Sequence, residues 1–465
     1  MTDLLISGGT IITMDATRRV IPDGAVLVSG GRIQAVGTRA ELPSQAAQVI
    51  DATGKVVMPG LIDSHGHAGH GLIKTMGSGD SMAWFNACGR IYTHASPPGF
   101  WRAEAKLAAL ERLKFGITTG VSVLGGGDCI MRVDAPEYGA AHCEAVAEVG
   151  IRDIMAVGHT RPPFPKAYDG AGVSAARQYE VMAALFRDWH GRGRQLLCTM
   201  MPVFRGDETH RAEIAEQGAA MLRLAAEHAA LFHQDGHRGG SIAVAHHEFA
   251  LLSPRAFLSH CTDLTEADIE ACAATGAHVV HNPSAIAAVR GFCPVVRLLE
   301  AGVNVVLGSD ATAPDRSSDM FRHMFMARRY AQRAAADDNL LPPGRVLEMC
   351  TVDAARALNI PDIGALEAGK RADIITVDMT APHMAPANMP VWRVVCFASG
   401  SDVRDVVVDG QVLMRERQVA HLDEAAVSAE AERATEAMLA SSGLGALVVE
   451  DAGWGRIRRG PALGA

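Results

Sequence analysis

Short apolar segments rich in β-branched residues fill the first 57 residues of the chain, separated by glycine pairs such as Gly8-Gly9 and Gly30-Gly31. Such segments predict strands joined by tight turns. The expected strands are Leu4–Thr10, Ile11–Met14, Ala25–Val28, Arg32–Val36 and Lys55–Met58. Together they indicate a small β-sandwich at the start of the chain.

From residue 59 the pattern changes to strand-like segments that alternate with segments of helical periodicity. Eight strands are predicted, at 61–67, 117–123, 151–158, 195–203, 230–235, 257–262, 278–283 and 304–310. This order over about 300 residues predicts an α/β fold with a TIM-type (β/α)8 barrel. A doubly wound open sheet is the competing architecture, but no GxGxxG opens a helix after the first strand of this region.

Strand-like segments return at 374–377, 391–397, 403–408 and 411–414, with a hairpin turn at Asp409-Gly410. The simplest interpretation is that they complete the first sandwich, so that the barrel is inserted into one small β-domain. We therefore predict a composite β-sandwich of residues 1–58 and 362–420, a barrel of residues 59–361, and a C-terminal helix and tail of residues 421–465. Two long connections, 81–98 and 160–173, are expected at the barrel mouth.

The composition of the chain excludes several classes of protein. Acidic residues outnumber basic ones by 52 to 43, a net charge of −9, so the chain lacks the basic field of a nucleic-acid-binding protein. No apolar run reaches the roughly 18 residues of a membrane helix, and the first residues do not resemble a secretory signal. Nine cysteines without a CxxC pair fit a reducing compartment. We expect a cytoplasmic protein that binds neither nucleic acid nor membrane.

His65 and His67 carry the strongest chemical signal. They lie two residues apart at the end of the first barrel strand, so both imidazoles point to one face of the strand. The carboxyl ends of the strands form the catalytic face of such a barrel. Two neutral imidazoles side by side suit a divalent transition metal, whereas two histidines on a surface loop are the alternative.

Three further strands end in residues of similar chemistry. His233 lies at the end of the fifth strand, His260 at the end of the sixth and Asp310 at the end of the eighth. Each one alone would more often be a polar residue that faces solvent. Taken together with His65 and His67, they predict one ring of metal-binding and acid–base groups at the catalytic face.

These motifs resemble the amidohydrolase superfamily. The matching pieces are Pro59–His67, Leu258–Cys261 and Gly308–Asp310, together with the family-like segments Ile6–Thr10 and Gly364–Ile374, so that the resemblance covers residues 3–420. Within the superfamily the chain most resembles the branch of cytosine-type deaminases and triazine hydrolases. Its length and one missing glutamate make it similar to the phenylurea hydrolases and to molinate (thiocarbamate) hydrolase.

The resemblance implies that His65, His67, His233 and Asp310 bind one divalent metal ion. It also implies that Asp310 takes a proton from the attacking water and that His260 lies beside that water. Some members of the superfamily hold a second metal through a lysine of the fourth strand, but 195–203 contains no lysine, so one ion is expected. We expect zinc, with cobalt, manganese or iron as alternatives, since nitrogen and oxygen ligands accept all of them.

One departure from the family pattern bears on the reaction. The deaminases of this superfamily place a glutamate three residues after the fifth-strand histidine, where this chain has Gly236. Asp235 or His237 could replace that acid, although Asp235 would alternate to the wrong face of an ideal strand. Other candidates for substrate binding are His159 and Asn282, with loop residues as the alternative interpretation. Five apolar residues near the first long loop indicate an apolar mouth: Met76, Met82, Trp84, Phe85 and Trp101.

The leading hypothesis from these residues is a metal-dependent hydrolase that attacks the carbonyl carbon of a urea, carbamate, thiocarbamate or amide, including xenobiotics such as phenylurea or thiocarbamate herbicides. The missing glutamate favours it, because a good leaving group needs less protonation than an aromatic ring does. The alternative is a deaminase of a purine, pyrimidine or triazine. A scaffold protein without activity is a third hypothesis, which the complete set of ligands opposes. The expected partner is a small neutral organic substrate, and we expect a homo-oligomer.

Overall fold

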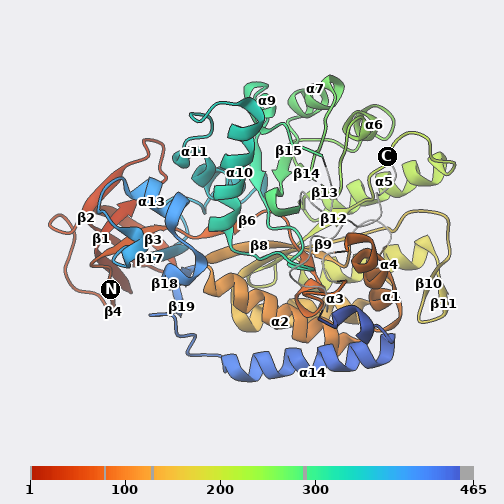
Figure 1. Cartoon of the computed structure of the whole chain (residues 1–465), viewed down its shortest axis with the longest axis horizontal. Coiled ribbons are helices and arrows are strands. Elements are labelled where there is room, and N and C mark those ends of the chain that lie inside the picture. Colours follow the sequence, from red (N-terminus) through yellow and green to blue (C-terminus); the bar gives the residue numbers. More distant parts are fainter. Residues whose placement is uncertain (1–2, 78–79, 127–129, 286–290, 451–465) are drawn as a thin grey trace.

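The computed structural model of the chain describes residues 3–77, 80–126, 130–285 and 291–450. Two β-structures organise these residues: a parallel barrel and, beside it, a mixed sheet built from both ends of the chain (Figure 1). The expected fold class is therefore confirmed. Residues 127–129, which continue the glycine-rich sequence that begins at Gly125, and the tail 451–465 lie outside the described residues.

The barrel consists of eight parallel strands whose neighbours along the chain are also neighbours in space. Every residue of the first strand is buried, and so is every residue of the last, as expected for strands covered by helices on one side and by the barrel interior on the other. In sheet order the strands are β6 (Leu61–Asp63), β8 (Ile117–Leu124), β9 (Arg152–Gly158), β12 (Gln195–Met200), β13 (Phe232–Gln234), β14 (Ala256–Ser259), β15 (His278–His281) and β16 (Val305–Leu307), and the short strand β7 (His67–Ala68) also pairs with β8.

Residues just after β6 and β16 bring the last strand of the barrel back to the first. The Ser64 N–H donates to the Leu307 carbonyl (3.0 Å), and the Asp310 N–H donates to the His65 carbonyl (2.9 Å). Gly66 and Asp310 form a parallel bridge. The barrel is therefore nearly closed, and the contacts that close it lie at the candidate metal ligands.

Helices follow most strands and cover the barrel (Figure 1). The connection expected at 81–98 instead contains a helix, α1, in which the Asp80 carboxylate caps the N–H groups of Met82 and Ala83. Residues 343–357 contain two short helices, α11 and α12. The main helices are α1 (Ser81–His94), α2 (Pro98–Lys114), α3 (Pro136–Val149), α4 (Ala175–Trp189), α5 (Arg211–Glu227), α6 (Ser241–His247), α7 (Glu266–Thr275), α9 (Val295–Glu300), α10 (Met320–Ala335), α11 (Pro343–Glu348), α12 (Val352–Ala357), α13 (Pro390–Phe397) and α14 (Glu424–Ser442).

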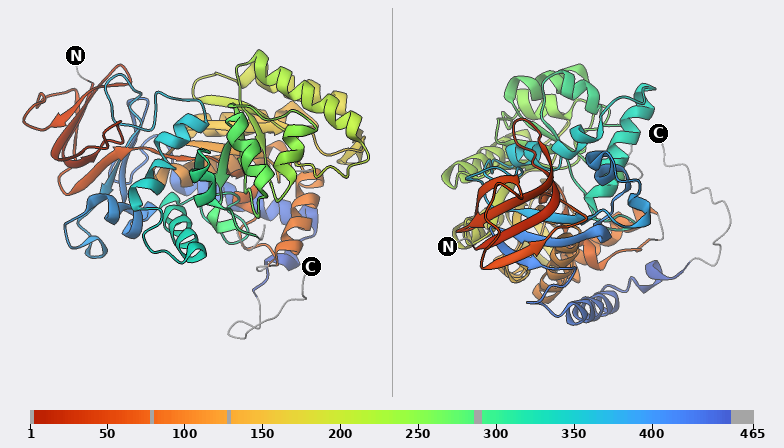
Figure 2. Two further views of the ribbon diagram at one scale, coloured as in Figure 1. Left: turned by 90° about the horizontal axis from the view of Figure 1, so that it is seen from above. Right: turned by 90° about the vertical axis from the view of Figure 1, so that its left-hand side faces the viewer.

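The second β-structure joins strands from both ends of the chain, as Figure 2 shows in red and blue. The described strands form one mixed sheet rather than two separate sheets, and β5 pairs with β17 where the two ends meet. In sheet order they are β19 (Gln411–Met414), β18 (Val403–Val408), β17 (Ile374–Asp378), β5 (Lys55–Pro59), β1 (Leu4–Ile12), β2 (Val20–Ser29) and β3 (Arg32–Thr38), with β4 (Gln48–Asp51) also paired to β1.

The strand expected at Val391–Phe397 is wrong, because this segment is helix α13. Pro390 stands in the first turn, where a missing N–H costs no helical hydrogen bond. Val394 and Val395 are buried in the core beside the barrel. A short apolar segment of this composition does not distinguish a strand from a helix, so tertiary packing decided the outcome.

Helix α14 lies along α2 on the outside of the barrel (Figure 1). Lys114 of α2 pairs with Glu424 at the start of α14, with 2.9 Å between Nζ and Oε1. No helix among the described residues is both long and apolar enough to cross a membrane. The eight cysteines within the described ranges form no disulfide.

A buried ion cluster joins the barrel to the mixed sheet. Arg152, at the start of β9, pairs with Asp373 beside β17 and with Asp409 in the turn between β18 and β19. Arg194 contacts the same Asp409, with 2.8 Å between Nε and Oδ2. Only 3% of the Arg152 side chain is exposed, so its charge depends on these two carboxylates.

We expect Arg152→Ala to lower the free energy of unfolding by about 3 kcal/mol, because the buried Asp373 carboxylate would lose its cation, whereas Asp409 would keep Arg194. Urea denaturation of both proteins measures this difference. The control is Arg187→Ala, which removes an exposed arginine paired with its neighbour Asp188 and should cost under about 1 kcal/mol. Equal losses in the two variants would contradict a structural role for the cluster.

Candidate metal centre

His65 lies in the turn between β6 and β7, His67 is the first residue of β7, and Asp63 at the end of β6 anchors the turn. The Asp63 carboxylate accepts hydrogen bonds from the N–H (2.8 Å) and the hydroxyl (2.7 Å) of Ser309. Between the two histidines the backbone packs closely against Arg112. A Cβ atom on Gly66 would lie only 2.3 Å from Arg112 Nη2. Glycine at position 66 therefore allows both imidazoles to reach the same point.

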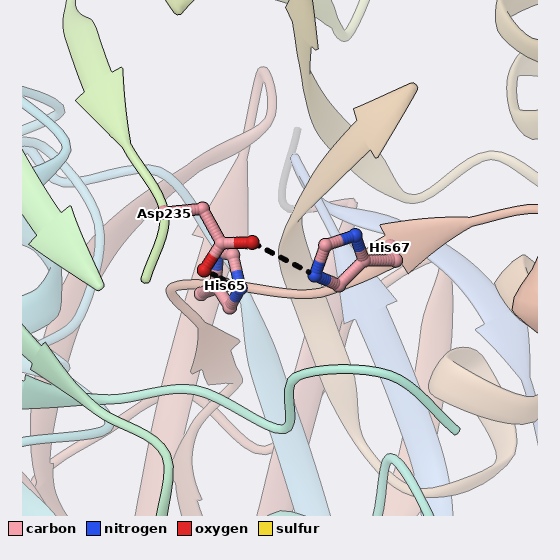
Figure 3. A group of neighbouring side chains, drawn as sticks. All are labelled: His65, His67 and Asp235. Atoms are coloured by element: carbon pink, nitrogen blue, oxygen red, sulfur yellow. Dashed lines mark ion pairs between the residues drawn. The ribbon is translucent and has the colours of Figure 1, made fainter. Parts of the chain in front are cut away.

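Two carboxylates face these imidazoles from the ends of β13 and β16. Asp235 lies 3.3 Å from His65 Nε2 through Oδ1 and 3.3 Å from His67 Nε2 through Oδ2 (Figure 3). Asp310 Oδ1 lies 3.2 Å from His67 Nε2 and 3.5 Å from His65 Nε2. Four side chains from distant parts of the sequence thus meet at one buried point.

His260 reaches the same point from the end of β14. Its Nε2 lies 3.1 Å from Asp235 Oδ1 and 3.8 Å from Asp310 Oδ1. His260 and Asp310 both have left-handed backbone angles, with φ values of 67° and 61°. Such angles cost a residue with a Cβ about 1 kcal/mol or more, and they occur where the surroundings hold a functional side chain in place.

Backbone carbonyls orient His67 and His233. Nδ1 of His67 donates to the Gly125 carbonyl (2.8 Å), and Nδ1 of His233 donates to the Phe257 carbonyl (2.8 Å). With one proton held at Nδ1, Nε2 is the atom of each ring that can bind a metal, which at His67 would displace a second proton. His233 Nε2 lies 3.0 Å from His65 Nδ1. The four expected ligands, His65, His67, His233 and Asp310, are therefore brought together.

The electrostatics of the centre favour charged carboxylates. Burial lowers the pKa of the His67 imidazole, but Asp235 and Asp310 outweigh burial and raise it to about 10. Burial likewise raises the pKa of both carboxyl groups, but neighbouring cations outweigh it. The imidazole of His65 holds the pKa of Asp235 well below its ordinary value, and the guanidinium of Arg316 does the same for Asp310. Two negative charges therefore stay in the centre at neutral pH.

These residues fit a divalent ion. His65 Nε2 and Asp235 Oδ1 are buried and form no hydrogen bond with any described residue, so both have lone pairs that a cation would use. Two combinations place one ligand atom from each residue within 4.8 Å of the others: His65, His67 and Asp235, and His65, His260 and Asp310. Imidazole nitrogens with carboxylate oxygens are the ligands of zinc and similar metals.

The expectation that Asp235 would face away from the centre is wrong. Asp235 lies two residues after His233, just as His67 lies two residues after His65, so the alternation along β13 directs both side chains to the same face. Gly236, with φ of 97°, follows Asp235, and a Cβ at this position would have no atom within 4 Å. The place of the family's glutamate is thus open, and a carboxylate from the preceding residue occupies the centre.

The other expected substrate contacts lie elsewhere. Asn282 is buried behind His260, where its Nδ2 donates to the Ser259 hydroxyl (2.7 Å) and lies 3.5 Å from His260 Nδ1. His237 Nδ1 contacts the Ser241 hydroxyl (2.9 Å). Burial lowers the pKa values of His237 and His159 to about 4, so both imidazoles are neutral. Contact of these three residues with substrate stays a prediction.

A cavity of about 420 Å³ opens above the centre, with His67, Asp235, His260 and Asp310 in its lining. Met82, Trp84 and Phe85 of the expected apolar mouth also line it, whereas Met76 and Trp101 are fully buried core residues. The cavity is therefore accessible to a small molecule on one side and reaches the candidate ligands on the other.

Sequence reasoning missed several residues of this cavity, among them His70 and Arg316. His70 is buried with Nδ1 unpartnered among the described residues, and its ring lies 4.8 Å from that of His67. Arg316 Nη1 donates to Asp310 Oδ2 (2.6 Å). Their positions, three residues after His67 and six after Asp310, were the available signals, but only tertiary structure shows that the side chains turn inward.

Comparisons with known proteins agree with this geometry. A family model described as "Amidohydrolase family" matches residues 211–413, and one described as "Imidazolonepropionase-like composite domain, bacteria" matches residues 24–48. The chain is 30% identical over 450 residues to a 5'-deoxyadenosine deaminase of Methanosarcina mazei, covering 95% of this chain and 99% of that protein. It is 32% identical to a 5-methylthioadenosine/S-adenosylhomocysteine deaminase of Syntrophobacter fumaroxidans, covering 90% and 94%.

Solved structures show the same architecture. An adenosine deaminase from Xanthomonas campestris with bound zinc superposes with a TM-score of 0.81 at 25% identity, covering 94% of this chain and 99% of that one. The atrazine chlorohydrolase TrzN from Arthrobacter aurescens TC1, in complex with zinc, gives a TM-score of 0.81 at 23% identity, covering 93% and 100%. The second likeness shows the fold alone.

We expect the purified protein to contain about one divalent ion per chain, and His67→Ala to lose most of it, because the variant removes an oriented Nε2 donor. Elemental analysis by mass spectrometry measures both. His247→Ala, on the exposed end of α6, is the matched control and should retain the metal. Unchanged metal content in the His67 variant would exclude this histidine as a ligand.

Proposed function

We propose, on the premise that this chain belongs to the amidohydrolase family, that it is a metal-dependent deaminase of an amino-substituted aromatic ring of the aminopurine class. The observation that carries the proposal is the convergence of His65, His67, Asp235 and Asp310 at the floor of one open cavity. The full-length relatives named as deaminases support this reaction better than cleavage at a urea or thiocarbamate carbonyl, which the sequence alone favoured.

A divalent ion held by His65, His67, His233 and Asp310 would lower the pKa of a water molecule to around 7 and so supply a nucleophile at neutral pH. Zinc is our choice among the metals, because nitrogen and oxygen donors in this number match its usual ligand set. The chain's own residues then have to position the ring, accept both protons of the attacking water and deliver one to the ring nitrogen and one to the departing amine.

Asp310 is suited to accept the proton of the attacking water. Its Oδ1 faces the imidazoles at the centre, while its Oδ2 accepts a hydrogen bond from Arg316. The guanidinium therefore fixes the carboxylate and leaves one oxygen for the proton. His260, whose Nε2 faces the same point, is placed to stabilise negative charge that develops during the attack.

Deamination also needs a proton on the ring nitrogen and another on the departing amine. Water adds its oxygen to the ring carbon, the bond from that carbon to the amino nitrogen breaks, and ammonia leaves. With Gly236 in place of the family's glutamate, Asp235 is the carboxylate that can perform this transfer. Its Oδ1 lies 3.1 Å from His260 Nε2, so a proton can pass between these two side chains.

One observation keeps carbonyl cleavage as a second candidate. The deaminases of the family have a glutamate that protonates the ring, and at this position the chain has Gly236 with open space beside it. Anilines and thiols leave with less protonation than a ring amine requires. A urea, carbamate or thiocarbamate would therefore react in the same centre without help at position 236.

We expect the zinc-loaded protein to release ammonia from 5'-deoxyadenosine, and a chelator to reduce the rate by at least about 100-fold, since the nucleophile depends on the metal. A coupled assay for ammonia measures the rate, and re-addition of zinc is the control. A phenylurea and a thiocarbamate are tested in parallel. Turnover of these carbonyl compounds, without ammonia release from any aminopurine, would reject the deaminase and support the second candidate.

Replacing Asp235 with asparagine should lower kcat by about 100-fold, because the amide keeps the shape but cannot transfer a proton. Metal content, measured on the same sample, separates this role from metal binding. Asp263→Asn is the matched control, since this aspartate caps a nearby loop through the Phe292 N–H (2.9 Å) and does not line the cavity. Full activity of the Asp235 variant would show that another group supplies the proton.

A further inference from the structure

A second cavity lies at the opposite end of the barrel from the metal centre. It opens beside the starts of β9 and β12, whereas the candidate metal ligands lie at or beyond the carboxyl ends of the strands. The ends of α3 and α4, the turn that joins α4 to β12, and Asp409 of the mixed sheet line it. Its volume is about 810 Å³, and it shares no described lining residue with the cavity above the metal centre.

Gln195, the first residue of β12, brings an unsatisfied amide to this second cavity. Only 1% of the residue is exposed, and neither its amide nitrogen nor its amide oxygen forms a hydrogen bond with any described residue. Buried amides in folded proteins are almost always hydrogen-bonded. Because Gln195 belongs to the lining, a molecule in the cavity can reach an unused donor and an unused acceptor on one carboxamide.

The segment before Gln195 supplies flat surfaces to the same cavity. Trp189, at the end of α4, and Arg192, in the turn that follows, both belong to the lining. The Arg192 guanidinium lies over the Trp189 ring, 4.7 Å from its centre, and the Arg192 residue is exposed. Indole rings and guanidinium groups both stack against aromatic rings. The cavity is therefore suited to a flat molecule.

The acidic groups of the lining are already paired within the protein. Arg102 of α2 lies 2.5 Å from Glu148 and 3.9 Å from Glu144. Asp409 lies 2.8 Å from Arg194, measured from Oδ2 to Nε. These carboxylates do not need a cation from the ligand, so the lining favours a neutral polar molecule over an ion.

We propose that this cavity is a second ligand site, which binds a neutral flat heterocycle through a hydrogen-bond donor and an acceptor that lie side by side on the edge of its ring. A glutamine carboxamide pairs with such an edge through two hydrogen bonds, as it does with the edge of adenine. A 6-aminopurine has this edge, and so does a lactam such as hypoxanthine. The site is separate from the metal centre, so the inference does not depend on the proposed reaction.

Three 9-methylated rings of similar shape test the role of this edge. 9-Methylhypoxanthine has the lactam edge, 9-methyladenine has the amino edge, and 9-methylpurine has acceptors but no N–H donor. In calorimetric titrations of the zinc-loaded protein, we expect at least one of the first two to bind about tenfold more tightly than 9-methylpurine, the difference that one additional hydrogen bond provides. The tighter of the two shows which edge the site prefers.

Gln195→Leu should lower the affinity for that compound about tenfold and leave the affinity for 9-methylpurine unchanged, because leucine removes only the polar atoms. Gln217→Leu is the matched control. The Gln217 side chain of α5 is also buried without a hydrogen bond to any described residue, but it does not line this cavity. Arg192→Ala, at an exposed position, should weaken the binding of all three rings and tests the site even if Gln195→Leu does not fold.

Two kinds of result would overturn the second site. The first is no binding, or equal affinities in the wild-type protein and the Gln195 variant, or an equal loss in the Gln195 and Gln217 variants. The second is binding that His67→Ala abolishes and Gln195→Leu retains, because that binding would belong to the cavity above the metal centre. Either result would reject this site alone and leave the proposed deaminase untouched.

Discussion

Closure of the barrel is the constraint on which the candidate site depends. The hydrogen bond from the Asp310 N–H to the His65 carbonyl joins the last strand end to the first, and the same two residues carry opposing parts of the metal centre. Asp63 adds a second link, because its carboxylate binds both polar groups of Ser309. The geometry that closes the sheet therefore also fixes the distance between histidine and aspartate.

The chain leaves regular strand geometry where the chemistry begins. His260 and Asp310 have left-handed backbone angles, and Asp235 follows the last residue of its strand. Side chains alternate along a strand, so His233 and Asp235, which are two residues apart, face the same side. His260 and Asp310 reach the same point where the backbone turns sharply just beyond their strands. The cost in backbone strain is offset by the hydrogen bonds and ion pairs of the buried surroundings.

Gly236, which stands where the family usually has an acid, supports different reactions in the sequence and in the folded protein. From the sequence alone the acid is missing, which favours substrates with good leaving groups. In the structure a carboxylate from Asp235 faces His65, His67 and His260, so the centre retains two acidic groups. The space that glycine leaves lies in the lining of the cavity above the centre.

The sequence by itself determined the fold class and the expected ligands, His65, His67, His233 and Asp310. Repeating apolar segments and histidines at strand ends are local patterns, which can be recognised in a sequence without knowledge of the contacts in the folded protein. Only the tertiary structure decided that 391–397 is a helix, that 81–94 is a helix, and that Asp235, His70 and Arg316 face the cavity. The reason is physical: short apolar segments suit either a strand or a helix, and the direction of a side chain beyond a strand end depends on the packing of distant residues against it.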